Sequence, residues 1–188
     1  MPIETDRLLL RPPQAGDGTV LFEGMEETFD QLHQWMNPWA KELGTAQEAE
    51  ATCRRAHARF ILREDMMVLV FDKATNKFIG ASGLHRFDWT LLRFEIGYWV
   101  RASAQGKGYA TDIANALTRY AFGALDARSV MIGYAAGNEH SKNVIEKLGF
   151  EFEGCATLAH ELPNGNIVDE LTYSRTNTDG LPNLNIKW

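Results

Sequence analysis

The sequence predicts a mixed α/β fold, built on a mostly antiparallel sheet with one parallel pair of strands near its middle. Three strand-like segments follow one another at short spacing in the middle of the chain, which indicates an antiparallel meander. The stretch Leu91–Tyr134 then reads strand, glycine loop, helix, strand, which is one right-handed crossover unit. A final hairpin pattern gives the element order β-α-α-β-β-β-α-β-α-β-β.

The first quarter of the chain predicts one strand and two helices. Thr5–Arg11 is a short apolar run ended by two prolines, which is typical of a strand. Asp17 is placed to cap a helix running toward Glu27. Residues 29–39 are rich in rings and contain a helix-breaking proline. Thr45 opens a long helical pattern that reaches Glu64, with apolar residues close to a 3.6 spacing.

The remaining elements follow from composition and period. The expected meander strands are Met66–Phe71, Phe78–Phe87 and Leu91–Val100. Apolar residues then repeat at helical spacing from Ile113 through Leu125, followed by a buried-strand candidate at Val130–Tyr134, a short helix at Ser141–Leu148 and a hairpin of Phe150–Leu162 with Asn166–Arg175. Gly149 follows the short helix, where a left-handed residue is favoured.

Length and charge restrict the class of protein. A chain of 188 residues fits one domain, expected over residues 1–176, followed by a tail of residues 177–188. The tail is polar, which favours loose packing, although Leu184, Ile186 and Trp188 alternate. A net charge of −6 argues against general nucleic-acid binding. No apolar run is long enough for a membrane helix, and the N-terminal residues do not resemble a signal peptide.

Neither cysteines nor histidines predict a metal site. Cys53 and Cys155 have no zinc or redox spacing, and we expect two free thiols in a reducing cytoplasm. The five histidines show no ligand spacing either. We therefore expect a cytoplasmic protein without a metal, either a monomer or a homodimer.

The most informative segment is the loop Gln105–Thr111, which lies between an expected strand and an expected helix. A helix N-terminus presents unpaired N–H groups and the positive end of the helix dipole, and glycines let the backbone approach an anion closely. Together they predict a phosphate cradle that an acidic protein can offer. Lys107 is placed to add one ionic contact.

The loop does not match either of two common nucleotide-binding motifs. A P-loop requires Ser or Thr directly after its lysine, but Gly108 follows Lys107. A dinucleotide fingerprint requires Gly or Ala where Thr111 stands. The pattern that fits is [QR]-x-x-G-x-[GA], which Gln105, Gly108 and Ala110 satisfy.

This loop resembles the acetyl-CoA pyrophosphate loop of the Gcn5-related N-acetyltransferases (GNAT), and three other segments resemble that family in order and spacing. Glu95–Val100 is similar to its fourth strand, Asn138–Phe150 to its N-x-x-S-x-x-V-x-E-K-x-G-F helix, and Thr5–Arg11 to its opening strand. A late Tyr173-Ser174 also resembles the ribosomal-protein N-terminal alanine/serine acetyltransferase subgroup.

The resemblance implies a fold, a donor and an acceptor. It implies a parallel pair splayed at a bulge near Gly97, which a glycine inside a strand favours, and the alternative is that Gly97 only makes room for a neighbouring ring. It implies acetyl-CoA as cosubstrate and direct transfer of acetyl to a primary amine, most favourably the N-terminal α-amine of a protein such as a basic ribosomal protein. The alternatives are a small amine (a polyamine or an aminoglycoside) and a non-catalytic acyl-CoA sensor.

An α-amine suits this chemistry because its pKa is about 7.7–8.0, so the neutral form costs only about 1 kcal/mol at pH 7. A lysine amine costs roughly 4.6 kcal/mol by the same arithmetic. A modest base is therefore enough, and Glu95, at the start of its strand, is the first candidate. Its alternative is an ordinary surface carboxylate. Second candidates are His160 and Glu161, whereas Asp169 and Glu170 read as exposed charges.

The resemblance also assigns residues to the cofactor, the leaving group and the acceptor. The implied cofactor contacts are Tyr98, Trp99, Val100, Gln105, Gly106, Lys107, Gly108, Tyr109, Ala110, Thr111, Asn138 and Asn143. Ser141 is implied near the sulfur as a proton donor, although it could instead cap its helix, and Tyr134 or Tyr173 is the alternative acid. The rings of Phe29, Trp35 and Trp39 either pack in the core or line the acceptor pocket.

Overall fold

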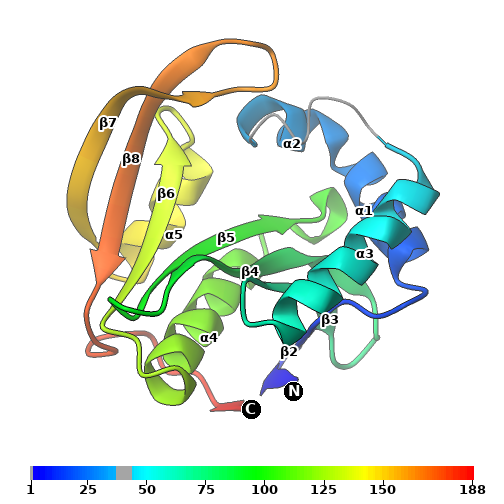
Figure 1. Cartoon of the computed structure of the whole chain (residues 1–188), viewed down its shortest axis with the longest axis horizontal. Helices are drawn as coiled ribbons and strands as arrows, with labels where there is room; N and C mark the ends of the chain where they lie inside the picture. Colours follow the sequence, from blue (N-terminus) through cyan, green and yellow to red (C-terminus); the bar gives the residue numbers. More distant parts are fainter. Residues whose placement is uncertain (1, 37–43) are drawn as a thin grey trace.

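The fold is a single mixed sheet with helices on both faces, in a computed structural model that describes residues 2–36 and 44–188 (Figure 1). Within these residues, nine strands lie in the order β7-β8-β6-β5-β4-β3-β2-β1-β9. The strands are β1 (Ile3–Thr5), β2 (Leu8–Arg11), β3 (Met66–Asp72), β4 (Phe78–Asp88), β5 (Arg93–Val100), β6 (Ser129–Ala135), β7 (Glu151–Glu161), β8 (Ile167–Arg175) and β9 (Ile186–Lys187). The helices are α1 (Gly18–Glu27), α2 (Phe29–Trp35), α3 (Ala46–Ile61), α4 (Tyr109–Ala124) and α5 (Glu139–Lys147), with a short 3₁₀ turn at Ala102–Ala104.

The expected single strand at the N-terminus is wrong, because the chain turns back on itself at residues 6–7. Ile3 pairs with Leu10, so β1 and β2 form an antiparallel pair. The hydroxyl of Thr5 accepts a hydrogen bond from the Leu8 amide at 2.9 Å and closes the turn. This turn leaves Arg7 pointing out of the sheet, where it reaches the glycine loop.

The helices expected after Asp17 and Thr45 are confirmed, but only Thr45 caps its helix through its side chain. Thr45 and Glu48 form a reciprocal capping box at the start of α3. Asp17 stands at the N-cap of α1, but its carboxylate makes no cap hydrogen bond and instead pairs with Arg11 at 2.7 Å. The additional short helix α2 occupies part of the ring-rich segment.

Two apolar clusters hold the helices to the sheet. The larger lies between the sheet and α4 with α5, and its fully buried residues include Phe94, Ile113 and Leu117. The smaller lies on the opposite face under α1 and α3, around Leu21 and Cys53. Alternate residues of each strand therefore face opposite helical layers.

The parallel pair is confirmed, and it separates after three residues. Glu95 of β5 is the last residue paired with β6, opposite Met131. Beyond it β6 pairs only with β8, and β5 only with β4. The β4–β5 register runs unshifted through Gly97, opposite Gly83, and its irregularity lies between His85 and Asp88. The sheet is therefore open between β5 and β6 on the side toward α2 and the glycine loop (Figure 1).

The expectation of a loose C-terminal tail is wrong. Ile186 pairs with Thr5, which makes β9 the edge strand beside β1. Leu181 is buried, and the Trp188 ring meets Tyr120 edge-on with 5.7 Å between centroids. The alternation of apolar residues, rather than the overall polarity of the tail, decides its structure.

Candidate active site

The glycine loop ends at the first turn of α4 in the arrangement that an anion cradle requires. Gly106 and Gly108 have φ values of +73° and +79°, and Gly108 is the N-cap of α4. An added Cβ on Gly106 would meet nothing within 4 Å, so here glycine serves conformation rather than space. The first-turn N–H groups of α4 have no partner within the helix and open toward the same side as the loop.

Arg7 braces this loop from the N-terminal turn. Its guanidinium bonds the carboxylate of Asp112 at 2.6 Å and the carbonyl of Lys107 at 3.1 Å, and lies 4.7 Å from the Tyr109 ring centroid. Arg7 thereby holds the glycine loop and the first turn of α4 in a fixed position relative to each other. No local pattern in the sequence indicates this contact, because Arg7 and Asp112 are 105 residues apart.

A second anchor holds the segment just before the loop. Glu27, at the end of α1, accepts a hydrogen bond from the Ser103 amide at 2.7 Å and pairs with Arg101. The hydroxyl of Thr28 accepts from the Ala102 amide at 3.1 Å. Burial raises the pKa of Glu27, but the hydrogen bonds from Ser103 and Arg101 outweigh it and lower this pKa to about 2.

The loop opens into a cavity of about 810 Å³ between α2, the end of β5 and the start of α5. Of the residues expected to hold the cofactor, those that line the cavity are Tyr98, Trp99, Val100, Gln105, Gly106, Gly108, Tyr109, Ala110, Thr111, Asn138 and Asn143. Lys107 does not line it, and its ammonium instead donates to the Ser103 carbonyl at 3.0 Å. This arrangement does not support the expected ionic contact from Lys107.

Tyr98 and Ser141 meet inside the cavity. Their hydroxyl oxygens are 3.0 Å apart, across the opening between β5 and α5. Burial raises the pKa of Tyr98 to about 12, so its phenol stays protonated at neutral pH. The cap of α5 is Asn138, whose side-chain oxygen accepts from the Ser141 amide at 3.1 Å. The Ser141 hydroxyl is therefore not the helix cap.

Glu95 lies on the opposite face of β5 and belongs to a charged cluster. Its carboxylate is 3.1 Å from the Arg86 guanidinium, which also stands 3.9 Å from Glu170. Burial raises the pKa of Glu95, the Arg86 charge opposes this shift, and the Glu170 charge adds to it. Glu170 is only 20% exposed, so the expectation that it is an exposed charge is wrong. The reason is that β8 packs beside the splayed end of β6, which directs Glu170 across Gly133 toward Glu95.

The three rings assigned to the acceptor have different positions. Trp35 lines the cavity, and its ring lies 3.4 Å from where a Cβ on Gly137 would be. It therefore connects α2 to the turn before α5, across the open side of the sheet. Phe29 does not line the cavity and instead packs against the His33 ring at 5.4 Å. Trp39 lies outside the described residues.

The remaining candidates do not reach the cavity. Tyr134 and Tyr173 pack together with 6.0 Å between ring centroids, and neither lines the cavity. Glu161 is exposed at the end of β7. Among the described residues, the Nε2 atom of His160 is buried without a hydrogen-bond partner.

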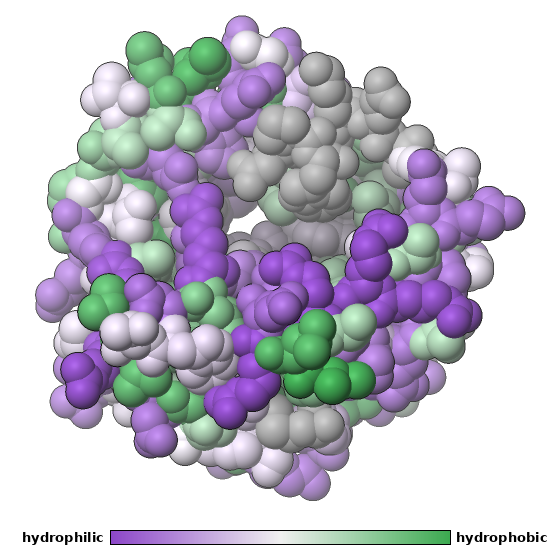
Figure 2. Space-filling view, viewed as in Figure 1, coloured by the Kyte–Doolittle hydropathy of each residue, from purple (hydrophilic) through white to green (hydrophobic). Residues whose placement is uncertain are grey.

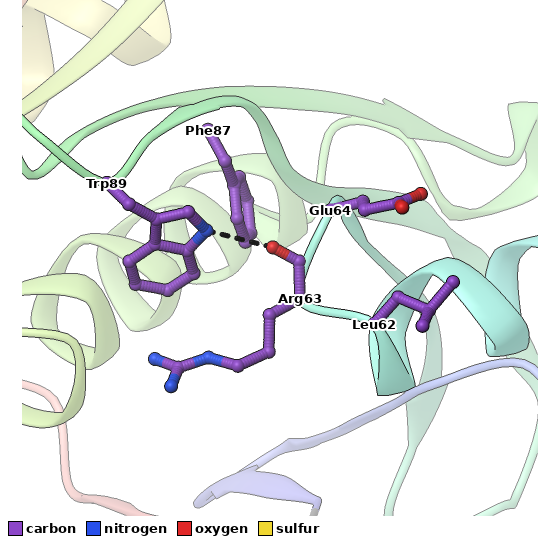
Figure 3. A pocket seen from close by; sticks show the side chains of 5 residues that line it. All are labelled: Leu62, Arg63, Glu64, Phe87 and Trp89. Carbon is purple, nitrogen blue, oxygen red and sulfur yellow. Dashed lines mark hydrogen bonds between the residues drawn. The ribbon is translucent and has the colours of Figure 1, made fainter.

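A second hollow, of about 670 Å³, lies at the end of α3 and the β4–β5 turn (Figure 3). Its lining residues are Leu62, Arg63, Glu64, Phe87 and Trp89. The Trp89 indole donates to the Arg63 carbonyl at 2.9 Å, and the Arg63 guanidinium lies 4.3 Å from the Trp89 ring centroid. None of the residues singled out in the sequence lines it, so the loop cavity is the candidate active site.

Comparison with known families decides the class of enzyme. The family model described as "Acetyltransferase (GNAT) domain" matches residues 7–151. The chain belongs to the GNAT acetyltransferase family. It is therefore an N-acetyltransferase, and acetyl-CoA is the acetyl donor of this family. The glycine loop, the helix N-terminus and the cavity beside them fit a ligand that carries a diphosphate.

Individual GNAT relatives agree with this assignment. The Bacillus subtilis (strain 168) protein named "Putative ribosomal N-acetyltransferase YdaF" is 42% identical over 77 residues, which are 41% of this chain and 42% of YdaF. The "Uncharacterized N-acetyltransferase YoaA" of the same organism is 24% identical over 92% of this chain and 94% of its own. The solved structure of RimL, a ribosomal L7/L12 α-N-protein acetyltransferase in complex with coenzyme A, has a TM-score of 0.83 and 25% identity over 92% of this chain and 98% of RimL.

The described part of the chain offers neither a metal-binding cluster nor a membrane-spanning helix. Within residues 2–36 and 44–188, no group of three or more His, Cys, Asp or Glu side chains is arranged to hold a metal ion. In the same part of the chain, no helix combines the length and the apolar character needed to cross a bilayer.

Proposed function

We propose that this protein transfers the acetyl group of acetyl-CoA to the N-terminal α-amine of a protein, such as a basic ribosomal protein. The observation that carries the proposal is that donor-binding groups and carboxylates lie on opposite sides of β5, where the sheet is open. A diphosphate cradle and the Tyr98–Ser141 pair lie toward the loop cavity, and carboxylates lie on the other face of β5. The similarity to YdaF and RimL, whose names state ribosomal acceptors, supports the choice of acceptor.

On the donor side, the main-chain N–H groups of the loop and of the first turn of α4 hold the diphosphate. The freed backbone of Tyr98–Val100, beyond the last β5–β6 pair at Glu95, is the place for the extended arm. When bound, acetyl-CoA supplies a thioester that is reactive toward a neutral amine. Ser141, hydrogen-bonded to Tyr98, is placed to donate a proton to the departing sulfur.

On the acceptor side, Glu95 and Glu170 attract an ammonium group. Both side chains are about one-fifth exposed, and Arg86, which stands within 4 Å of each, partly neutralises them. Glu95 is the carboxylate that meets the acceptor amine, and its role as base remains a prediction. An α-ammonium requires the least work from such a site, since releasing its proton at pH 7 costs only about 1 kcal/mol. The proposed acceptor also places the enzyme in the cytoplasm, where ribosomal proteins are made.

The proposal is tested by thiol release from acetyl-CoA with matched acceptors. The panel contains a basic peptide with a free N-terminal serine, the same peptide with its N-terminus blocked, spermidine and kanamycin. We expect turnover with the free peptide and none with the blocked one. Faster turnover of spermidine or kanamycin would replace the protein acceptor with a small amine. Tight binding of acetyl-CoA in calorimetry, with no turnover across the panel, would contradict a catalytic function.

A further inference from the structure

His85 and Asp65 form a hydrogen-bonded pair on the acceptor face of the sheet, and no role is yet assigned to them. The Nδ1 atom of His85 lies 2.9 Å from the Asp65 carboxylate. An ionised carboxylate can only accept hydrogen bonds, so Nδ1 must carry the proton. The neutral ring therefore has its lone pair on Nε2. Asp65 is 13% exposed and the His85 side chain 35%, so the carboxylate is sheltered and the ring is accessible.

Two paired glycines leave the space that the His85 ring occupies, called here its seat. Gly83 of β4 and Gly97 of β5 stand opposite each other. A Cβ on Gly97 would lie 3.1 Å from the Cδ2 atom of His85, and one on Gly83 would lie 2.9 Å from Nε2. The imidazole thus lies over both strands, in space that any other residue would fill. Gly97 makes room for a neighbouring ring, which was the alternative interpretation of this glycine in the sequence.

The seat lies directly beside the opening in the sheet. Gly97 is between Glu95, the last residue paired with β6, and Trp99, which lines the loop cavity. Because side chains alternate along a strand, Glu95 and Trp99 share the face on which the His85 ring lies. His85 is also directly opposite Glu95 in the register. Figure 2 shows the molecule hollowed near its centre in this view, with hydrophilic side chains along part of the rim.

The charges around the acceptor create a need for a base other than a paired carboxylate. Carboxylates stabilise the ammonium form of a bound amine, so they raise the pKa of the group that must lose its proton. Glu95 is already ion-paired with Arg86 at 3.1 Å. Imidazole has the ordinary pKa closest to neutral among side chains, which suits a general base at pH 7.

We propose that His85, held in one tautomer by Asp65, removes the proton of the acceptor ammonium, while Glu95 with Glu170 binds and orients that ammonium. This rests on the proposed function. The ammonium gives one proton to Nε2 of His85, which releases it to water. The neutral amine then forms the C–N bond as the C–S bond breaks, and its second proton goes to the departing sulfur. One amide, one thiol and one free proton result.

The first test compares rates across pH with the free-serine peptide. Without the base, only the fraction of amine that is already neutral reacts, about one in ten at pH 7, so His85→Gln should lose about tenfold or more in kcat/KM. The loss should nearly disappear near pH 9.5, because almost all of the α-amine is then neutral without help from a base. Asp65→Asn should show the same trend. Glu64→Gln is the matched control. It removes the carboxylate next to Asp65 in the chain, which also lies near Arg59 but does not contact His85.

Other charged groups near His85 can also affect how the rate depends on pH, so their variants must be compared with His85→Gln. The groups around His85 and its neighbour Glu95 are Asp65, Arg59 of α3, Arg86 of β4, Glu95 and Arg93 of β5, and Glu170 of β8. Glu95→Gln should raise KM for the peptide at all pH values. A loss in Glu95→Gln that disappears at high pH, with a pH-independent loss in His85→Gln, would overturn the assignment.

The second test needs no turnover. Nitrogen NMR of the free enzyme should show neutral His85 protonated at Nδ1, and Asp65→Asn should mix the tautomers. Adding the free-serine peptide should shift the His85 Nε2 signal, and the blocked peptide should not. Protonation at Nε2 in the free enzyme would refute the proposal. If the enzyme acetylates spermidine but no peptide, the proposed acceptor fails, and the pH comparison with spermidine still judges His85.

Discussion

Ser141 and Asn138 divide two tasks at the start of α5, and the division can be measured. Asn138 caps the helix through the Ser141 amide, whereas the Ser141 hydroxyl bonds Tyr98 at 3.0 Å. Ser141→Ala should therefore lower kcat by about 10²-fold, as loss of a general acid does, with little change in melting temperature. Asn138→Ala should instead cost about 1 kcal/mol of stability. Kinetics and thermal unfolding of both variants check this, and a large loss of stability in Ser141→Ala would return it to a capping role.

Glu27 gives the clearest pH dependence of a single residue. Its pKa is about 2 in the folded protein, below its ordinary value of 4.5. A lowered pKa contributes stability that is fully present above pH 4.5 and is lost as the pH falls toward 2. We expect Glu27→Gln to remove this part of the acid dependence, about 1 kcal/mol after solvent screening.

Urea unfolding at several pH values measures the Glu27 contribution. Glu26→Gln serves as control, because it removes a neighbouring exposed charge at the end of the same helix. If both variants keep the parent's acid dependence, the contact of Glu27 with Arg101 and Ser103 does not contribute to stability.

The loop–α4 element combines backbone strain with ligand binding, and a matched glycine elsewhere separates the two. Gly106 and Gly180 share a φ of +73°, and neither would bring a Cβ within 4 Å of another group. Alanine at either position should therefore cost about 1–2 kcal/mol of stability. Only Gly106→Ala should also weaken acetyl-CoA binding, by about tenfold, because it displaces N–H groups that face the diphosphate.

Calorimetry with acetyl-CoA checks this comparison. Equal donor affinity in Gly106→Ala and Gly180→Ala, together with the expected loss of stability in both, would move the diphosphate away from the loop.

At the scale of the whole molecule, the C-terminal tail completes the sheet. Strand β9 covers the outer edge of β1, and the Trp188 ring packs near Tyr120 and fills space above Gly123. Trp188→Ala should cost about 1–2 kcal/mol, since the ring is 47% exposed. Lys187→Ala, which removes only a surface ion pair with Glu4, should change stability by less than about 1 kcal/mol. Thermal unfolding compares the two variants, and equal effects would show that the ring contact does not hold the tail.

The sequence alone determined the elements whose signals are local. The capping box at Thr45, the three meander strands and the glycine-rich turn before α4 depend on residues a few positions apart, so spacing and residue type were enough to predict them. The same local motifs indicated the GNAT family. The tail and the first strand were misjudged, because their structure depends on pairing partners distant in the chain.

Only the tertiary structure decided which side chains meet at the site. Arg7 reaches the loop, Glu170 faces Glu95, and Asp65 holds His85 because the sheet brings together strands that are far apart in the sequence. A charged or polar residue carries no sign in the sequence of the partner it will have. Burial and partners in the folded chain fix its charge state, and with it the chemistry that it can perform.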